Sequence, residues 1–244
     1  MKQVSRCFIM AAVCISLFLG QAQARDLKAS LPILPPLVET KDKGILVDLV
    51  KAMAEEYKGG KITWDVYPFA RSLDNVEKGR ADFHMPLLVN PNISPDKLPF
   101  QFSSDIIFKV QFVLYTNKNN SKINPSNLSS FNVETDQGHV EFFDFKVSGS
   151  PSIESSLKKV DMGRIDGWIF AMPESDGLLK KAGFKNIKRW KYKSFDVRIV
   201  LPKGKEGKET DKILTDLIKK LKTSGKYQKI MGPILDQKFD DWQM

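Results

Sequence analysis

The chain has 244 residues, of which 42% are hydrophobic and 27% are charged, a balance that is typical of a globular protein and excludes disordered, collagen-like and coiled-coil sequences. The net charge is +9, but the basic residues are mostly lysines spread along the whole chain, and no nucleic-acid-binding motif accompanies them. We therefore expect a solvated basic surface and no nucleic-acid partner.

The first 24 residues have the layout of a secretory signal peptide. Lys2 and Arg6 precede an almost unbroken apolar stretch over residues 7–20, which the small residues around Ala24 follow. That stretch is shorter than the roughly 20 residues that a membrane anchor needs. Cleavage after Ala24 would remove both cysteines, so we expect a soluble, cysteine-free, monomeric protein in the periplasm.

Two elements open the mature chain. Residues 48–57 place apolar side chains on one helical face and stop at Gly59-Gly60, which predicts a helix. Residues 61–67 alternate between apolar and polar side chains, which predicts a strand.

An internal repeat follows. Residues 72–82 recur as residues 156–166 with six of eleven positions identical. Each copy ends a helix at a Gly suited to a left-handed cap and leads into an apolar strand, at residues 83–88 and 167–170. Two such helix-to-strand units predict two α/β lobes, each with its own sheet.

The second half of the chain continues the alternation of helices and strands. Strands are predicted at residues 131–134, 145–148 and 187–190, and helices at residues 152–162, 174–182 and 210–223.

Two extended segments, residues 109–116 and 195–201, flank the second lobe and are natural crossovers. The expected fold class is therefore α/β, with two lobes joined by a two-strand hinge. Residues 25–112 with 196–244 form lobe 1, and residues 113–195 form lobe 2.

A set of short motifs runs through the whole mature chain in a fixed order. They are Pro35-Pro36-Leu37, Gly44-Ile45-Leu46-Val47-Asp48-Leu49, Tyr67-Pro68-Phe69-Ala70-Arg71, Gly79-Arg80-Ala81-Asp82, Phe102-Ser103, Gly163-Arg164-Ile165-Asp166 and Ser224-Gly225-Lys226-Tyr227. In order and spacing the chain resembles the extracellular solute-binding proteins of the polar-amino-acid uptake type, with the type II periplasmic binding fold. The resemblance implies lobes that close over a small solute, which an ABC transporter of the inner membrane then receives.

The resemblance also implies a ligand site. Leu34 stands where many relatives place an aromatic residue, and Phe69 stands at an apolar contact. Met85 and Pro86 replace a stretch that in amino-acid binders offers hydroxyls and backbone donors, which implies an apolar wall.

Both halves of the amino-acid clamp of the family are changed. Lys97 is the only basic residue offered where relatives carry an Arg for the ligand carboxylate, and Ala171 stands where an acidic residue would hold the ammonium. A buried ammonium without a carboxylate partner costs several kcal/mol, so an ordinary zwitterionic amino acid is a doubtful ligand.

Four further residues carry candidate chemistry of their own. Arg71 is the best remaining contact for an anion, because its guanidinium can bind a carboxylate with two hydrogen bonds. Gly138 and His139 precede a predicted short helix and could present backbone N–H groups to an anion, and Trp168 could stack on a ligand ring. No spacing joins the histidines into a metal motif, so neither metal nor cofactor is expected.

The first functional hypothesis is a non-enzymatic binding protein for a small organic solute. A periplasmic enzyme of the same fold, similar to cyclic-acid dehydratases, is an alternative that would need a carboxylate such as Glu39 or Glu134. A sensory or dehydrogenase-associated accessory protein is the other alternative.

Overall fold

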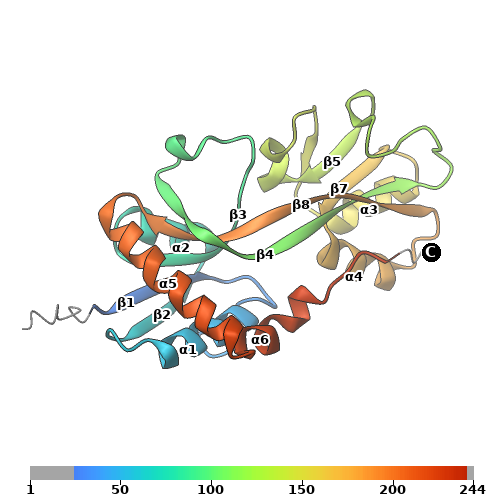
Figure 1. The fold of residues 1–244 in the computed structure, drawn as a ribbon. Coiled ribbons are helices and arrows are strands. Elements are labelled where there is room, and N and C mark those ends of the chain that lie inside the picture. Colours follow the sequence, from blue (N-terminus) through green and yellow to red (C-terminus); the bar gives the residue numbers. More distant parts are fainter. Residues whose placement is uncertain (1–24, 241–244) are drawn as a thin grey trace, which may run out of the picture.

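A computed structural model describes residues 25–240 (Figure 1). Its eight strands form one sheet in the order β2-β1-β3-β8-β4-β7-β5-β6, with helices packed on it, so the predicted mixed α/β class is confirmed. The predicted signal peptide lies outside the described residues and stays a prediction.

The first part of the chain supplies three parallel strands, which are covered by its own helices α1 and α2 and by α5 and α6 from the last part of the chain. On one face α1, α5 and α6 enclose a large apolar core that includes Leu31 and Leu217. On the opposite face α2 packs against the strands, where Ser30 contacts Ser72. The bounds are β1 Leu27–Pro32, α1 Ile45–Glu56, β2 Ile62–Tyr67, α2 Phe69–Glu77, β3 Phe83–Leu88, α5 Lys205–Thr223 and α6 Lys226–Leu235.

The middle of the chain builds a second set of strands and helices. β5 pairs in parallel with β6 and β7, and apolar cores fill both faces, one around Ile169 and one around Trp168. The strand predicted at residues 145–148 begins instead at Ser148, because Phe145 packs against the core from the preceding loop. The bounds are β5 Val133–Asp136, β6 Ser148–Ser150, α3 Ile153–Asp161, β7 Gly167–Ala171 and α4 Met172–Ala182, with 3-10 helices at Pro95–Lys97, Leu128–Ser130 and Gln137–Phe142.

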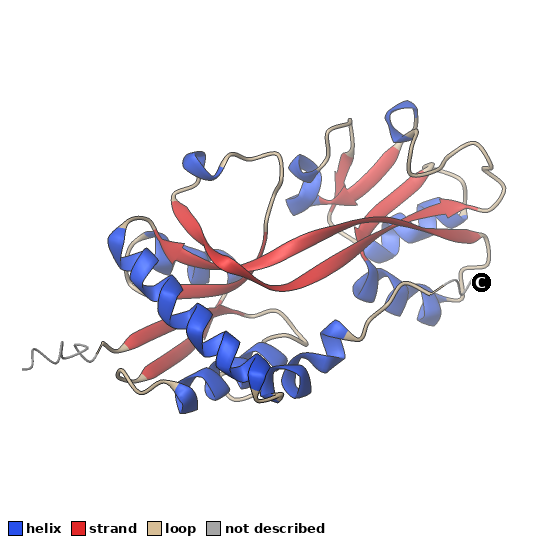
Figure 2. Cartoon of the chain, in the orientation of Figure 1, coloured by secondary structure: helices blue, strands red, loops and turns tan. Residues whose placement is uncertain are grey.

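Two long strands, β4 (Phe100–Asn117) and β8 (Ile187–Pro202), run from the first set of elements to the second (Figure 2). They include the two predicted crossovers and pair with each other in antiparallel fashion, with register shifts at three points. The expectation that each lobe has its own sheet is wrong. Because β4 and β8 stay hydrogen-bonded along most of their length, one sheet continues through both sets.

The sequence repeat is a structural repeat, α2 followed by β3 and α3 followed by β7. Gly79 has φ 66° and Gly163 has φ 67°, so both helices end in the left-handed conformation that the sequence predicts.

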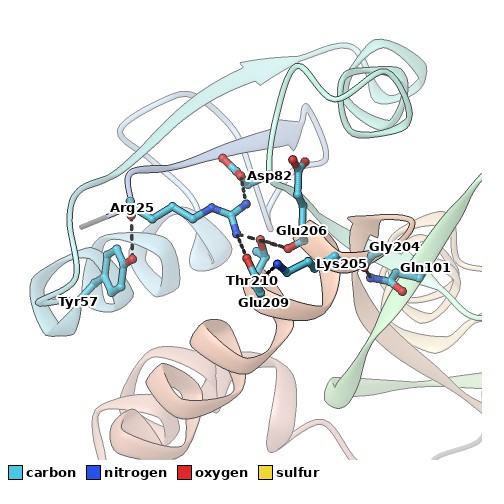
Figure 3. A network of polar contacts seen from close by, with 9 residues as sticks. All are labelled: Arg25, Tyr57, Asp82, Gln101, Gly204, Lys205, Glu206, Glu209 and Thr210. Atoms are coloured by element: carbon cyan, nitrogen blue, oxygen red, sulfur yellow. Dashed lines mark hydrogen bonds and ion pairs between the residues drawn. The ribbon is translucent and has the colours of Figure 1, made fainter. Parts of the chain in front are cut away.

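The two repeated aspartates make the same contacts in both copies. The N–H of Asp82 donates to the carbonyl of Lys28 while its Oδ2 accepts from the Lys28 N–H, both at 2.8 Å. Asp166 repeats this with Asn132, at 2.9 and 2.8 Å. Figure 3 shows that Asp82 also holds Arg25, with 2.8 Å between Oδ1 and Nη2. Each aspartate therefore fastens its strand to the neighbouring strand.

Candidate functional site

The predicted contacts in the first set of elements lie near the start of α2. Phe69 is the first residue of that helix and is 39% exposed, with its ring edge-on to His84 at 5.5 Å between centroids. Leu34 is half-buried in the loop after β1, where it pairs with the backbone of Val38. Phe69 thus offers apolar surface at the N-terminus of a helix.

Arg71 lies in the first turn of α2 and is exposed. Its Cζ lies 5.2 Å from the centroid of the Tyr67 ring, a cation–π contact that orients the side chain. Among the described residues we find no carboxylate paired with this guanidinium, so its hydrogen-bond donors are free to meet an anion.

Three residues of the predicted site are buried. Met85 has no exposed surface and belongs to the core under α1, and Pro86 beside it is also buried. Trp168 is fully buried under α4, where its Nε1–H donates to Ser175 Oγ at 3.1 Å. This corrects the expectation that Met85 and Trp168 contact a solute, because strand alternation turns both side chains into the cores.

The predicted anion site at Gly138 and His139 is already occupied by a carboxylate. Asp136 Oδ1 accepts from the Gly138 N–H at 2.9 Å and lies 3.0 Å from His139 Nδ1. The Asp136 side chain therefore fills the place where a ligand anion was expected and would repel one. The His139 ring also packs against the rings of Phe112, Phe142 and Phe170.

Asp136 is a candidate ligand contact that the sequence analysis missed. It is the last residue of β5, and in α/β folds ligands bind beyond the carboxyl ends of parallel strands. Its side chain is 34% exposed, so one side of the carboxylate still faces solvent. Its position just after a short predicted strand was the available signal.

The clamp positions fit the sequence analysis only in part. Lys97 is exposed at the end of a 3-10 helix, whereas Ala171 is buried directly before α4. The loop after β3 contacts the 3-10 helix after β5, because Asn92 Nδ2 donates to the carbonyl of Glu141 at 3.0 Å. Leu88, at the end of β3, packs against the cores of both sets.

A chain of buried polar groups lies beneath Phe69. Asn75 Nδ2 donates to Ser30 Oγ, the Ser30 and Ser72 hydroxyls are 3.1 Å apart, and Ser72 Oγ lies 2.8 Å from His84 Nδ1. Burial lowers the pKa of His84 to about 4, and hydrogen bonding to the backbone of Pro86 only partly offsets this effect. The other ring nitrogen, Nε2, has no partner of full hydrogen-bond geometry among the described residues.

This buried histidine predicts an acid-sensitive fold. Because the pKa of His84 is about 4 in the folded state and near 6.5 when unfolded, the unfolded state binds more protons between these values. The free energy of unfolding should therefore fall by about 3 kcal/mol from this group as the pH drops from 7 to 4. Urea titrations at several pH values should give a shallower pH dependence for His84→Gln. His139→Gln is the matched control, and equal pH dependence in both variants would refute the prediction.

A cavity of about 850 Å³ lies elsewhere, between the start of α1, the start of α4, the end of α6 and the long strands. None of the eight predicted site residues lines it. Three of its polar lining residues are engaged: Lys109 pairs with Asp196 outside the cavity lining at 3.1 Å, and Ser194 Oγ donates to Gln111 Oε1 at 2.9 Å. In Figure 1, α1, α4 and α6 lie below the long strands, whereas β5 lies above them.

Both carboxylates considered for catalysis are engaged in ion pairs. Glu39 lies 2.5 Å from Lys43 Nζ, and Glu134 accepts from Ser156 Oγ and from Lys159 Nζ, at 2.7 and 2.9 Å. Each is thus held by a neighbouring side chain. Within residues 25–240 no group of three or more side chains is arranged to hold a metal ion, and no helix is long and apolar enough to cross a membrane.

Solved structures share this fold at low sequence identity. The ligand-binding core of GluR0 from Nostoc punctiforme, in complex with L-glutamate, is 18% identical with a TM-score of 0.61, covering 86% of this chain and 100% of that one. The ancestral amino-acid-binding protein AncCDT-1, a precursor of cyclohexadienyl dehydratase, is 19% identical with a TM-score of 0.58, at 86% and 95% coverage. The substrate-binding protein of an amino acid ABC transporter is 17% identical with a TM-score of 0.58, at 87% and 100% coverage.

The fold is therefore that of the periplasmic binding proteins. The sequence model of the bacterial extracellular solute-binding proteins, family 3, matches residues 34–235, and the chain belongs to this family. The resemblance inferred from the short motifs is thus confirmed. Among curated proteins no relative is similar enough to count as a match.

Proposed function

We propose that this chain is an exported solute-binding protein of the periplasm, which captures a small organic solute between two lobes and delivers it to an ABC transporter. The observation that carries the proposal is the separation of the apolar cores. The buried members of one pair of cores lie within residues 27–108 and 197–231, and those of the other pair lie within residues 112–195.

This separation supports lobe 1 at residues 25–112 with 196–244 and lobe 2 at residues 113–195. The long strands β4 and β8 join them, and a register shift between Gln111 and Val113 lies where the strands leave lobe 1. A pair of strands interrupted in this way can bend as a hinge, whereas a core shared by both lobes would resist bending.

The relatives support a small-molecule ligand and a transport role. The GluR0 core binds L-glutamate, and another solved structure belongs to an amino acid ABC transporter. We infer that the solute of this chain differs from an ordinary amino acid, because Ala171 provides no carboxylate for an ammonium. Asp136, the nearby alternative, is already shared with His139 and the Gly138 N–H.

We infer a binding function without catalysis, because Glu39 and Glu134 are both held in ion pairs with lysines. A dehydratase-like reaction would need a carboxylate free to exchange a proton with its substrate. Turnover of a cyclic acid by the purified protein would overturn this inference.

Calorimetric titration tests the ligand class. We expect the standard amino acids to bind weakly, because burying an ammonium without a counter-charge costs several kcal/mol. A set of small carboxylates with apolar bodies should include tighter ligands, since Phe69 supplies apolar area and Arg71 a charge. Micromolar binding of a simple amino acid would contradict the proposal, as would the absence of binding in both sets.

A further inference from the structure

A short segment follows α6 and leaves lobe 1. Ile234 and Leu235, at the end of α6, pack against the lobe 1 core beside α1. The chain then passes residues 236–238, which are exposed, along one wall of the 850 Å³ cavity. One end of this segment is therefore fixed to lobe 1.

The other end of the segment is fixed to lobe 2. Phe239 packs against the core around Trp168, and the Cζ of Arg189 lies 4.7 Å from the centroid of its ring. Arg189 Nη1 also donates to the backbone carbonyl of Asp240 at 3.0 Å and lies 3.4 Å from its Oδ1. The adjacent residues Phe239 and Asp240 thus both contact the guanidinium of Arg189.

That guanidinium is held rigidly inside lobe 2. Its side chain is 1% exposed, and its Nε donates to Asp176 Oδ1 at 2.9 Å while Nη2 donates to Oδ2 at 2.5 Å. Tyr115 donates to the same carboxylate at 2.7 Å. Arg189 is a residue of β8 and Tyr115 a residue of β4, so the anchor is built on both long strands.

We propose that residues 236–240 form a C-terminal strap that ties lobe 1 to lobe 2 and restricts their relative motion. The inference rests on the proposed two-lobe function. Four Cα–Cα steps lead from Leu235 to Phe239, and they can span at most about 14 Å when fully extended. Within the described residues the strap is a third connection beside β4 and β8, so the lobes cannot move far apart at this point unless Phe239 and Asp240 leave Arg189.

The strap is placed to tune solute affinity without touching the solute. It runs past the end of α6 and the start of α4, whereas Phe69 and Arg71 lie on α2, on the opposite face of the lobe 1 strands. A tether that narrows the range of lobe orientations changes the population of the binding-competent arrangement, and therefore the apparent affinity.

Distance measurements between spin labels test the strap. Residues 25–240 contain no cysteine, so labels can be attached at Glu55→Cys on α1 and Lys181→Cys on α4, both exposed positions. We compare the mature chain, a chain truncated after Leu235, and the single variants Phe239→Ala and Lys238→Ala, all without solute. The truncated chain and Phe239→Ala should give a wider or shifted distance distribution, whereas Lys238→Ala should match the unmodified chain.

Identical distributions for the truncated and complete chains would overturn the strap. If Lys238→Ala changed the distances as much as Phe239→Ala, Phe239 would not be the residue that anchors the strap. Because no solute is present, these outcomes are independent of the calorimetric test of the proposed function. If the protein binds carboxylates but truncation has no effect on the distances, the strap proposal is refuted and the proposed function stands.

Discussion

Replacing Asp176 by asparagine is expected to lower the free energy of unfolding by about 3–5 kcal/mol, which corresponds to a drop of about 10 °C in melting temperature. The carboxylate accepts two hydrogen bonds from Arg189 and one from Tyr115, in buried surroundings beside the core around Trp168. The variant removes the buried counter-charge of that guanidinium, and the exposed carboxylate of Asp240, 3.4 Å from Nη1, offsets the desolvation of the charge only in part.

The shift in the pKa of Asp176 is not the reason for the expected loss of stability. Burial raises the pKa of its carboxyl, and the hydrogen bond from Tyr115 and the charge of Arg189 offset only part of that effect. Because the folded pKa is raised, this group favours the folded state as the pH falls through that pKa, the opposite sign to His84. The expected loss in Asp176→Asn therefore comes from the arginine, which loses the carboxylate that holds it with two hydrogen bonds.

Chemical denaturation measures this effect directly. Asp216→Asn is a matched control, because Asp216 pairs with Lys220 at 2.7 Å on the exposed surface of α5, where an ion pair contributes little. A loss of stability in Asp176→Asn no larger than that of the control would contradict the expected role of the pair.

Replacing Arg71 by alanine is expected to weaken the binding of an acidic solute by roughly 1.5–3 kcal/mol, or about tenfold to 150-fold in dissociation constant. The physical reason is the loss of charge-assisted hydrogen bonds from a guanidinium that is exposed near Phe69. Stability should change little, since Arg71 is anchored only by its contact with the Tyr67 ring among the described residues.

The measurement is calorimetry with the carboxylate that binds most tightly in the panel described above. Arg71→Lys should fall between the two proteins, because a lysine keeps the charge but cannot bind a carboxylate with two planar hydrogen bonds. Arg80→Ala is the matched control, since Arg80 is exposed beyond the other end of α2 and pairs with Asp74. Unchanged affinity in Arg71→Ala would place the site elsewhere.

The sequence determined those features that depend on local chemistry. The repeat predicted two helix-to-strand units, and Gly79 and Gly163 end their helices as expected because only a residue without a Cβ adopts positive φ at little cost. Apolar periodicity likewise located α1, α3 and α5, and the extended segments located the crossing strands.

The tertiary structure decided which side of each strand faces a core. Alternation along a strand defines two faces but does not say which of them is covered, so Met85 and Trp168 were placed at the site although both are buried. The single sheet was likewise not predictable. The sequence predicts two extended segments, but it does not predict that they pair with each other.

Specific side-chain contacts also lay beyond the sequence. Asp136 and His139 are three residues apart, yet the sequence does not predict their pairing, which accompanies the packing of the His139 ring against Phe112. Arg189 and Asp240 are 51 residues apart, and no local pattern predicts that Phe239 and Asp240 reach the core around Trp168. Such contacts arise only when the packing of whole elements brings their ends together, which is why the strap and its buried anchor became visible in the fold alone.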